Sequence, residues 1–488
     1  VLSPLPFISG CFSILYNFIV MGWVINAMAS VTSVMLNIDK WTAVWICVII
    51  ALVYAILSGF WGVVITDMVQ FCIAMFGSIA LAIIALNYIG GMENLLSKLS
   101  GLADISSTND NTIKFIPPLP KSDLNTITFW ESPFSKFLVF IGIMWWSHHG
   151  TDGGGYIIQR MSSAKNERHA LLATLWFNLA HYALRVWPWI IVALVSIVMF
   201  PTIPDSYSEL GVKAGYPLVM NTLLGPGLKG ILIVSFLAAF MSTIDTHLNW
   251  GASYIINDIY KRFYKPHESE SHYVIVGKIS TVILMALAAF TSLKMQSISK
   301  AWEFIFSMGA GIGLVLILRW FWWRVNAWSE ITALFTSIVI TIILEIIAAS
   351  QTIQAGNNYS LFGSPPILFG ISLQIHHKLM IIVPLAIATW ITVTLLTDPE
   401  PQETLTEFYE RVQPGGWWGS ISEQFTHTME PVSKGFFIQW ISGIMMIYGF
   451  TFGIGSLIFL KYSQAVILLG FAILGFFLVW RKSISKLN

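Results

Sequence analysis

The sequence predicts an all-α, polytopic membrane protein with about twelve transmembrane spans, and three observations lead to this fold class. Of its 488 residues, 56% are hydrophobic and only 10% are charged, whereas a typical soluble domain carries about 25% charged residues. Apolar runs long enough to cross a bilayer, which takes about 20 residues per helix, recur along the chain. Aromatic residues make up 14% of the sequence and include 21 Trp, as expected of lipid-facing helices with interfacial belts.

The composition also excludes several classes of protein. The 26 Lys and Arg balance 25 Asp and Glu to a net charge of +1, so the chain has no basic field for nucleic acid. So few charges exclude a soluble globular enzyme and a disordered chain. Cys11, Cys47 and Cys72 lie in apolar runs without metal-ligand spacing, and we expect them to pack as small apolar side chains. The expected surroundings are a lipid bilayer, with no nucleic-acid partner and no obligate protein partner evident.

The predicted spans follow one another with modest polar material between them. They cover residues 5–36, 41–59, 62–88, 135–158, 170–200, 228–257, 271–293, 300–322, 327–348, 378–397, 437–460 and 463–480, and the longer ones indicate tilt. The intervening polar segments are 89–134, 201–227 and 398–435. Within the last of these, Glu403 to Val412 is predicted as a short surface helix.

Basic residues near the span ends predict the orientation, because Lys and Arg collect at cytoplasmic ends. Clusters follow even-numbered spans at Arg160, Lys165 and Arg168, at Lys261, Arg262 and Lys265, at Arg319 and Arg324, and at Arg481, Lys482 and Lys486. We therefore expect the C-terminus in the cytoplasm. The chain begins with Val, and no cleavable signal pattern precedes the first apolar run, so we expect that the natural N-terminus is missing.

The sixth span carries a face of small and hydroxyl residues. Ala239, Ser242, Thr243 and Thr246 recur at i, i+3, i+4 and i+7, which places them on one side of a helix. Hydroxyl and carbonyl oxygens on such a face suit a hard cation. The same residues also suit close helix packing, with each hydroxyl bonded back to the i−4 carbonyl. Asp245, at the edge of this face, favours the cation.

A second polar position is Asp67 in the third span, within GVVITDMVQF. It lies one to two turns inside the expected membrane boundary. A carboxylate there could be stabilised by the helix dipole, or it could bind a cation or carry a proton.

The fourth span is predicted to be broken. Ser147, His148, His149 and Asp152 precede three consecutive glycines at 153–155, and an unwound segment in a membrane is tolerated only beside a cavity. Transporters bind their solutes at such breaks. A metal site at the two histidines is the weaker alternative, because adjacent side chains point to different faces and no HExxH-type partner follows.

The fifth span carries Asn178, His181 and Arg185 in LWFNLAHYALRVWPW. Arg185 stays charged, so it must pair with a carboxylate or face water. It either pairs with Asp152 as a structural contact or binds solute directly together with His181.

Taken in order, GVVITDMVQF, GYIIQRMSSAKNERHA and LAAFMSTIDTHLNWGASYIINDIYKRF resemble the sodium:solute symporter family, whose members carry sugars, proline, pantothenate or sialic acid. The resemblance runs from the first span to about residue 325. It implies the inverted five-plus-five helix repeat (LeuT-like) with extra peripheral helices. Residues 1–88 would be the remainder of the first repeat (three spans), 89–134 an extracytoplasmic loop, 135–325 the second repeat (five spans) and 326–488 four peripheral spans. The first two core helices would be absent.

The resemblance also implies the roles of the polar residues. The principal sodium site would use the Ala239 carbonyl with the hydroxyls of Ser242 and Thr243. Asp67, Asp245 and Thr246 would form a second sodium or proton site. Solute contacts in sugar-carrying members fall near Ser147 and His181, where this chain lacks the usual amide and lysine.

The expected function is therefore sodium-coupled import of a small polar solute by alternating access, not enzymatic catalysis, in the inner membrane of a bacterium. The expected ligands are Na⁺ and a sugar-like, sugar-acid or other organic solute. One alternative is a proton-coupled carrier that uses Asp67 or Asp245. A more remote one is an intramembrane metal-dependent enzyme built on His148, His149 and Asp152.

Overall fold

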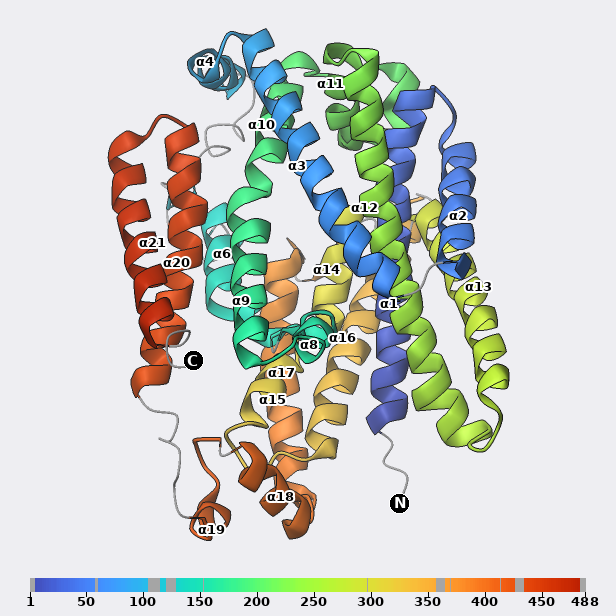
Figure 1. Cartoon of the computed structure of the whole chain (residues 1–488), viewed down its shortest axis with the longest axis vertical. Helices are drawn as coiled ribbons and strands as arrows, with labels where there is room; N and C mark the ends of the chain where they lie inside the picture. Colours follow the sequence, from blue (N-terminus) through green and yellow to red (C-terminus); the bar gives the residue numbers. More distant parts are fainter. Residues whose placement is uncertain are drawn as a thin grey trace. The chain divides into compact units, whose positions relative to one another are not determined.

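The computed structural model describes residues 5–57, 60–103, 115–119, 129–151, 153–295, 297–356, 365–368, 370–412, 414–425 and 434–482. This part of the chain is almost entirely helical (Figure 1), which confirms the all-α prediction. Within it, 9 helices are long and apolar enough to cross a membrane, and two shorter apolar helices cover Lys40–Val53 and Pro133–Ser147. The chain divides into two compact units.

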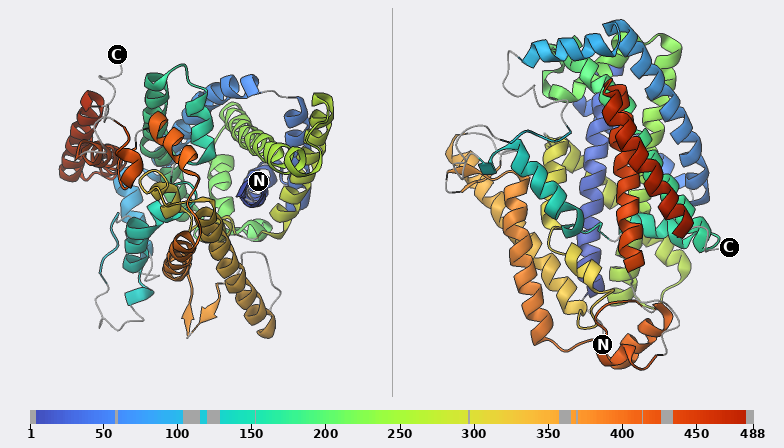
Figure 2. Two further views of the ribbon diagram at one scale, coloured as in Figure 1. Left: turned by 90° about the horizontal axis from the view of Figure 1, so that it is seen from below. Right: turned by 90° about the vertical axis from the view of Figure 1, so that its left-hand side faces the viewer.

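Unit 1 comprises the described residues of Val1–Asp110 and Arg185–Ala301. Its central helix is α1 (Leu5–Leu36), which contacts four other helices and two η segments of the unit (Figure 2). The remaining elements are α2 (Lys40–Leu57), α3 (Phe60–Ile89), α4 (Met92–Ala103), α10 (Val186–Met199), the 3-10 helix η4 (Asp205–Ala214), α11 (Gly215–Leu223), α12 (Pro226–Ser253), the π-helix η5 (Tyr254–Tyr264) and α13 (Glu270–Lys294).

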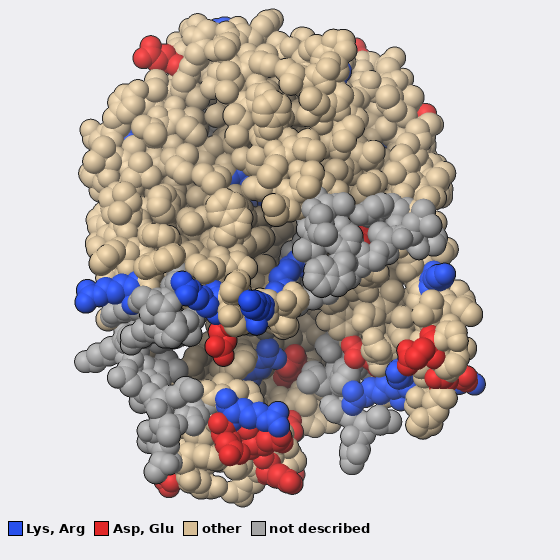
Figure 3. Space-filling model, viewed as in Figure 1, with Lys and Arg blue, Asp and Glu red and all other residues tan. Residues whose placement is uncertain are grey.

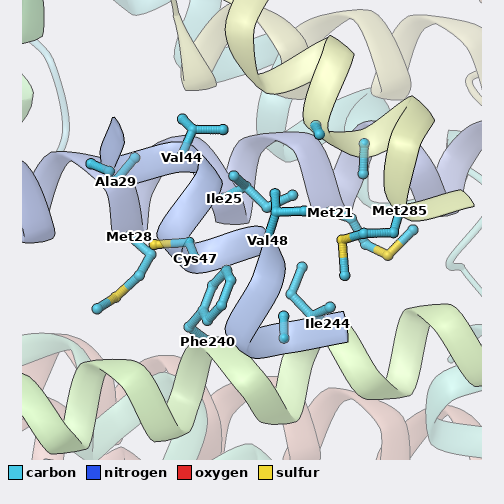
Figure 4. Packing of buried hydrophobic residues seen from close by; sticks show 14 of the residues in the cluster. Met21, Ile25, Met28, Ala29, Val44, Cys47, Val48, Phe240, Ile244 and Met285 are labelled. Atoms are coloured by element: carbon cyan, nitrogen blue, oxygen red, sulfur yellow. The ribbon is translucent and has the colours of Figure 1, made fainter. Parts of the chain in front are cut away.

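The apolar core of unit 1 lies where α1, α2, α12 and α13 meet. Figure 4 shows ten of its labelled side chains: Met21, Ile25, Met28, Ala29, Val44, Cys47, Val48, Phe240, Ile244 and Met285. The core side of α12 is thus apolar, and its hydroxyl residues lie on other faces of the helix. Cys47 packs in this core as expected, whereas Cys11 and Cys72 are exposed.

A buried polar link ties α1 to the last turn of α13. The side-chain amide of Asn26 donates to the carbonyl oxygens of Ser292 at 3.0 Å and Met295 at 3.1 Å. The carbonyls of a last helical turn lack hydrogen-bond donors within their own helix, so the Asn26 amide supplies donors that the backbone cannot. Lys213 of η4 donates in turn to the Asn26 Oδ1 at 3.0 Å.

The ends of α12 follow from local sequence. Gly225 is the N-cap residue and Pro226 occupies the first turn, where the missing N–H of proline costs nothing. At the other end the helix continues as η5 up to Tyr264, shortly before Pro266, because the residue that precedes a proline is disfavoured in the helical conformation. Ser269 then caps α13 by accepting a hydrogen bond from the His272 amide.

Unit 2 comprises the described residues of Asn111–Leu184, Trp302–Tyr359 and Ser364–Asn488. The first part contains α6 (Pro133–Val139), the π-helix η2 (Phe140–Met144), α7 (Trp145–Ser147), α8 (Gly154–Ser162), α9 (Glu167–Asn178) and the π-helix η3 (Leu179–Leu184). The remainder contains the end of α14 (Ile298–Met308), α15 (Gly313–Leu318), α16 (Ala327–Gln354), β1 (Ile367–Leu368), β2 (Ile371–Ser372), α17 (Ile375–Leu396), α18 (Gln402–Val412), α19 (Gly419–Ser422), α20 (Lys434–Ile458) and α21 (Tyr462–Lys482).

Two pairs of neighbouring helices dominate the later part of unit 2. Helices α20 and α21 lie side by side, as do α16 and α17 (Figure 2). A partly buried ion pair joins the second pair, with the Lys378 Nζ 2.9 Å from the Glu345 Oε1. The short strands β1 and β2 pair antiparallel, with Ile367 opposite Ser372.

The structure corrects the predicted elements in three places. The span predicted at 300–322 is two helices, α14 and α15, separated by a turn. The polar segment 89–134 contains α4, and the segment 201–227 contains η4 and α11. The surface helix predicted from Glu403 to Val412 is confirmed as α18.

Large stretches of the visible surface carry no charged side chain (Figure 3). Many large apolar side chains are exposed on the long helices, including Ile279, Ile283 and Phe290 of α13. Such surfaces are unfavourable in water and are what a helix surrounded by lipid requires.

Candidate functional site

The hydroxyl face predicted in the sixth span is present on α12. The helix is unbroken across Ala239, Ser242, Thr243 and Thr246, so their spacing keeps them on one side. Ala239 is exposed, Ser242 and Thr243 are half-buried, and Thr246 is buried. The Thr243 hydroxyl donates to the Ala239 carbonyl at 2.9 Å. This is the i−4 bond of the packing interpretation, and it leaves the lone pairs of the hydroxyl oxygen able to accept a hydrogen bond or to bind a cation.

Asp245 lies at the buried edge of this face and is 1% exposed. The same turn continues to His247, whose Nδ1 lies 2.5 Å from the Asn17 Oδ1 of α1. Asn17 also donates to the Ser13 carbonyl at 2.7 Å. The rings of Tyr16 and His247 lie 6.0 Å apart. A polar α1–α12 contact therefore adjoins the hydroxyl face, and it holds α12 against the central helix of unit 1.

Asp67 belongs to α3, within unit 1. Its side chain lies outside the described part of the structure, so its contact with Asp245 or Thr246 stays a prediction.

The break predicted in the fourth span is present in unit 2. Helix α7 ends at Ser147, and His148 is extended with φ −91° and ψ 165°. The His148 Nδ1 accepts a hydrogen bond from the Gly150 amide at 2.9 Å. Gly153 and Gly154 have φ of +97° and +65°, which side chains with a Cβ rarely adopt. Helix α8 then begins at Gly154.

A second break, within the span predicted to be continuous at 300–322, lies against the first. Between α14 and α15 the chain turns at residues 309–312. A Cβ added to Gly309 would lie 2.6 Å from the His149 Nδ1. One added to Gly313 would lie 2.3 Å from the Trp146 carbonyl oxygen. The ring of His148 meets that of Phe306 edge-on at 5.2 Å. Glycine at these positions lets the two unwound segments approach to backbone contact.

The sequence did contain a sign of this second break. Glycines recur at alternate positions in SMGAGIGL, at 309, 311 and 313. The triglycine of the fourth span predicts a break, and the same argument applies to these glycines. The polar residues Asn17 and Asn26 of the first span were also missed, although an amide inside an apolar run indicates a buried polar contact.

Ser147 is the most enclosed of the predicted solute residues. It is 1% exposed, and its hydroxyl makes no hydrogen bond with the part of the chain that the structure describes. A buried hydroxyl without a partner is costly. It is therefore the position at the break where a ligand would gain most from supplying one.

The remaining predicted solute residues are only partly described. Asp152 lies outside the described residues. His181 belongs to the π-helix η3 in unit 2 and stacks on Phe177 with ring centroids 5.0 Å apart. Arg185 begins the second segment of unit 1, and its guanidinium lies 5.1 Å from the ring centre of Trp189. The proposed pairing of Arg185 with Asp152 stays a prediction.

The described geometry does not support the weaker interpretation, a metal site at His148 and His149. The rings of His148 and His149 lie 5.8 Å apart and nearly perpendicular. No three His, Cys, Asp or Glu side chains among the described residues gather closely enough to hold a metal ion.

Comparison with known proteins places these features in a family. A solved structure of a Na⁺-coupled sialic acid symporter, in a substrate-bound outward-open state, superposes with a TM-score of 0.56. It covers 80% of this chain and 74% of that one at 16% identity. This likeness confirms the LeuT-like fold that the sequence resemblance implied.

Curated relatives are named as cotransporters or transporters. Sodium/glucose cotransporter 4 of Danio rerio is 25% identical over 80% of this chain and 60% of its own length. The sodium/glucose cotransporter of Vibrio parahaemolyticus is 24% identical over 64% of this chain and 58% of its own length. The osmoregulated proline transporter OpuE of Bacillus subtilis is 23% identical over 58% of this chain and 53% of its own length. The chain thus spans about 60% or less of these relatives' length.

The family model named "Sodium:solute symporter family" matches residues 4–353. Together with the apolar helices, this identifies an integral membrane protein. Because the match spans well over half of the 488 residues, the chain belongs to the sodium:solute symporter family.

Proposed function

We propose that the protein of which this chain is part is a sodium-coupled symporter that imports a small, polyhydroxylated organic solute by alternating access. The observation that carries the proposal is the hydroxyl–carbonyl face of α12 in a member of the sodium:solute symporter family. The chain spans about 60% of its first relative's length, so activity, substrates and partners of the whole protein are part of the proposal.

Sodium would bind on the α12 face as cargo. Hard cations prefer several oxygen ligands. The Ala239 carbonyl and the Thr243 hydroxyl already lie 2.9 Å apart, with Ser242 adjacent on the same face. These three oxygens would supply part of the coordination, and water or other oxygens of the complete protein would supply the rest. Asp245, Thr246 and Asp67 are proposed for a second sodium or proton site.

The solute would bind at the broken fourth span. Ser147 offers a buried hydroxyl, and His148 and His149 offer ring nitrogens that donate or accept hydrogen bonds. Such groups match the hydroxyls of a sugar, a cyclitol or a sugar acid. Relatives named for glucose, mannose and myo-inositol support this class. Asp152, His181 and Arg185 complete the proposed solute set, and Arg185 would favour an acidic group.

Coupling follows from linkage. If sodium stabilises the solute-ready state, each ligand raises the affinity for the other by the same factor. Both are then released on the other side when the helices rock about the site. We further propose that the protein lies in a bacterial inner membrane with a cytoplasmic C-terminus, as the basic clusters after even spans favour.

A proton-coupled carrier is the second candidate, and one observation favours it. Asp245 is a nearly fully buried carboxyl group at the edge of the ion face, and a buried carboxyl group readily exchanges a proton when its surroundings change.

The test is sodium-dependent thermal stabilisation in detergent, with choline replacing sodium as the reference. We expect sodium to raise the Tm of the wild type by several degrees, because a ligand that binds only the folded state stabilises it. The double variant Ser242→Ala/Thr243→Ala should lose this rise. Thr392→Ala is the matched control, because Thr392 makes the same i−4 hydrogen bond, at 2.7 Å, on α17.

Two outcomes would contradict the sodium assignment. One is a wild type whose Tm does not respond to sodium, and the other is a double variant that responds as fully as Thr392→Ala. Solute uptake that survives sodium removal and stops when the pH gradient is dissipated would move proton coupling to first place.

A further inference from the structure

A pocket of about 310 Å³ lies between α2, α12 with η5, and α13, the helices on the right of Figure 1. It is lined by both apolar and polar residues. The polar ones are Asn249, Ser253, Asn257, Lys278 and Thr281. None of these residues belongs to the proposed sodium or solute sites.

The polar lining is rich in hydrogen-bond donors. Asn249, Ser253 and Asn257 are spaced four apart, and the Asn257 amide donates to the Ser253 hydroxyl at 3.1 Å. Across the pocket, Lys278 brings three N–H donors and a positive charge. No carboxylate is among the described residues that line it. Amide, hydroxyl and ammonium donors without a carboxylate suit an anion.

Lys278 is unusual for its position. It lies within the apolar span Glu270–Lys294, about 12 Å along the helix from its first residue. It makes no ion pair or hydrogen bond with the residues that the structure describes. A charge inside a membrane span with no partner among the described residues is costly and usually marks a site, so we expect an anionic ligand to supply its counter-charge.

Gly277 keeps the pocket open beside that charge. A Cβ at this position would lie 3.0 Å from the Ile256 Cδ1, so α13 and η5 approach closely here. With no side chain at Gly277, the space next to Lys278 and Thr281 stays available to a ligand.

The surface beside the pocket is apolar. Val274, which lines the pocket, is 57% exposed, as is the next residue, Ile275, and Val53, two residues before the lining residue Ala55 of α2, is 54% exposed. A ligand with an anionic head and apolar chains would satisfy both surfaces at once. A free anion would satisfy only the polar part.

We propose that this pocket binds the phosphate of an anionic lipid headgroup, with Lys278 as its counter-charge and the acyl chains along the exposed face of α13. The basic clusters at the ends of neighbouring spans predict that this end of α13 lies at the cytoplasmic side, where basic pockets between helices bind anionic headgroups. The proposal does not rest on sodium coupling.

The experiment measures the Tm of the purified chain in detergent with three probes: phosphatidylglycerol, phosphatidylcholine and inorganic phosphate. We expect phosphatidylglycerol to raise the Tm by roughly 2–4 °C and phosphatidylcholine to have a smaller effect. In Lys278→Gln, half of the maximal shift should need about five- to tenfold more phosphatidylglycerol. Lys278→Arg should restore the response, and Lys294→Gln, an exposed lysine of the same helix, should leave it unchanged.

The outcomes separate the sources of phosphate. A Lys278-dependent shift with inorganic phosphate alone would support an anion site but overturn the lipid as its ligand. Equal shifts with both lipids, or equal responses of Lys278→Gln and Lys294→Gln, would overturn the site. The sodium response of the same samples reports separately on the α12 face, so the two proposals fail independently.

Discussion

Replacing Gly313 by alanine tests whether backbone contact between the two helix breaks positions the solute residues. A Cβ at Gly313 would lie 2.3 Å from the Trp146 carbonyl oxygen, 2.5 Å from the Ser147 carbonyl carbon and 2.7 Å from the His148 carbonyl oxygen. All three are backbone atoms, so no side-chain rotation relieves the overlap. Restoring ordinary contact requires the broken segment to move by about 1 Å, and overpacking of this kind costs about 1–3 kcal/mol.

The consequence for transport should exceed the loss of stability. A displacement of about 1 Å in a residue that positions substrate can lower a rate by about a hundredfold. We therefore expect Gly313→Ala to lower the Tm by a few degrees and to reduce sodium-driven uptake into vesicles by at least about tenfold. The control is Gly443→Ala in α20, where an added Cβ meets no atom within 4 Å. Uptake and Tm indistinguishable between the two variants would refute the assignment of the break as the solute-positioning element.

Three further predictions concern unit 1. Asn26→Leu leaves two carbonyls at the C-terminal end of α13, those of Ser292 and the C-cap residue Met295, without their donor. It should lower the free energy of unfolding by about 2 kcal/mol or more, measured by thermal unfolding, and a loss below about 0.5 kcal/mol would contradict the link. Burial, aided by the positive charge of Lys40, lowers the pKa of Lys213 to about 8, against about 10.4 for a free lysine. Between these two pH values the unfolded chain therefore binds more protons than the folded one, and the free energy of unfolding should rise from about pH 8 to about pH 10. Lys213→Met should flatten that rise, and an equal rise in both proteins would exclude Lys213 as its cause. Asn17→Leu removes the partner that His247 has at 2.5 Å and should cost about 1–3 kcal/mol, whereas Asn17→Leu/His247→Leu should recover part of this loss; additive losses in the double-mutant cycle would show that the pair does not interact.

Particular residues show which structural features the sequence alone can predict. Glycine and its neighbours predicted the break after Ser147 because φ above zero is available only to glycine at low cost. The face of α12 was predictable because helical periodicity depends on spacing alone. The break at residues 309–312 was equally present in the sequence but was interpreted as a continuous span, since its alternate glycines also fit a packed helix.

Contacts between distant segments were not predictable. That Asn26 meets the end of α13, that Asn17 meets His247, and that Gly309 faces His149 depends on which helices become neighbours. Each of these pairs is separated by more than 150 residues in the sequence. Local pattern assigns a residue to a helix face, but many helices could cover that face.

The sequence by itself determined the membrane setting, the helical class, the hydroxyl face of α12 and the unwinding of the fourth span. Each of these depends on composition or on spacing within one segment, where covalent geometry fixes the outcome. Only the tertiary structure decided that Ser147 is buried without a hydrogen-bond partner among the described residues, that the two breaks touch, and that Lys278 faces a pocket. These depend on burial and on close packing between segments, because a side chain's partner is set by whichever segment folds against it.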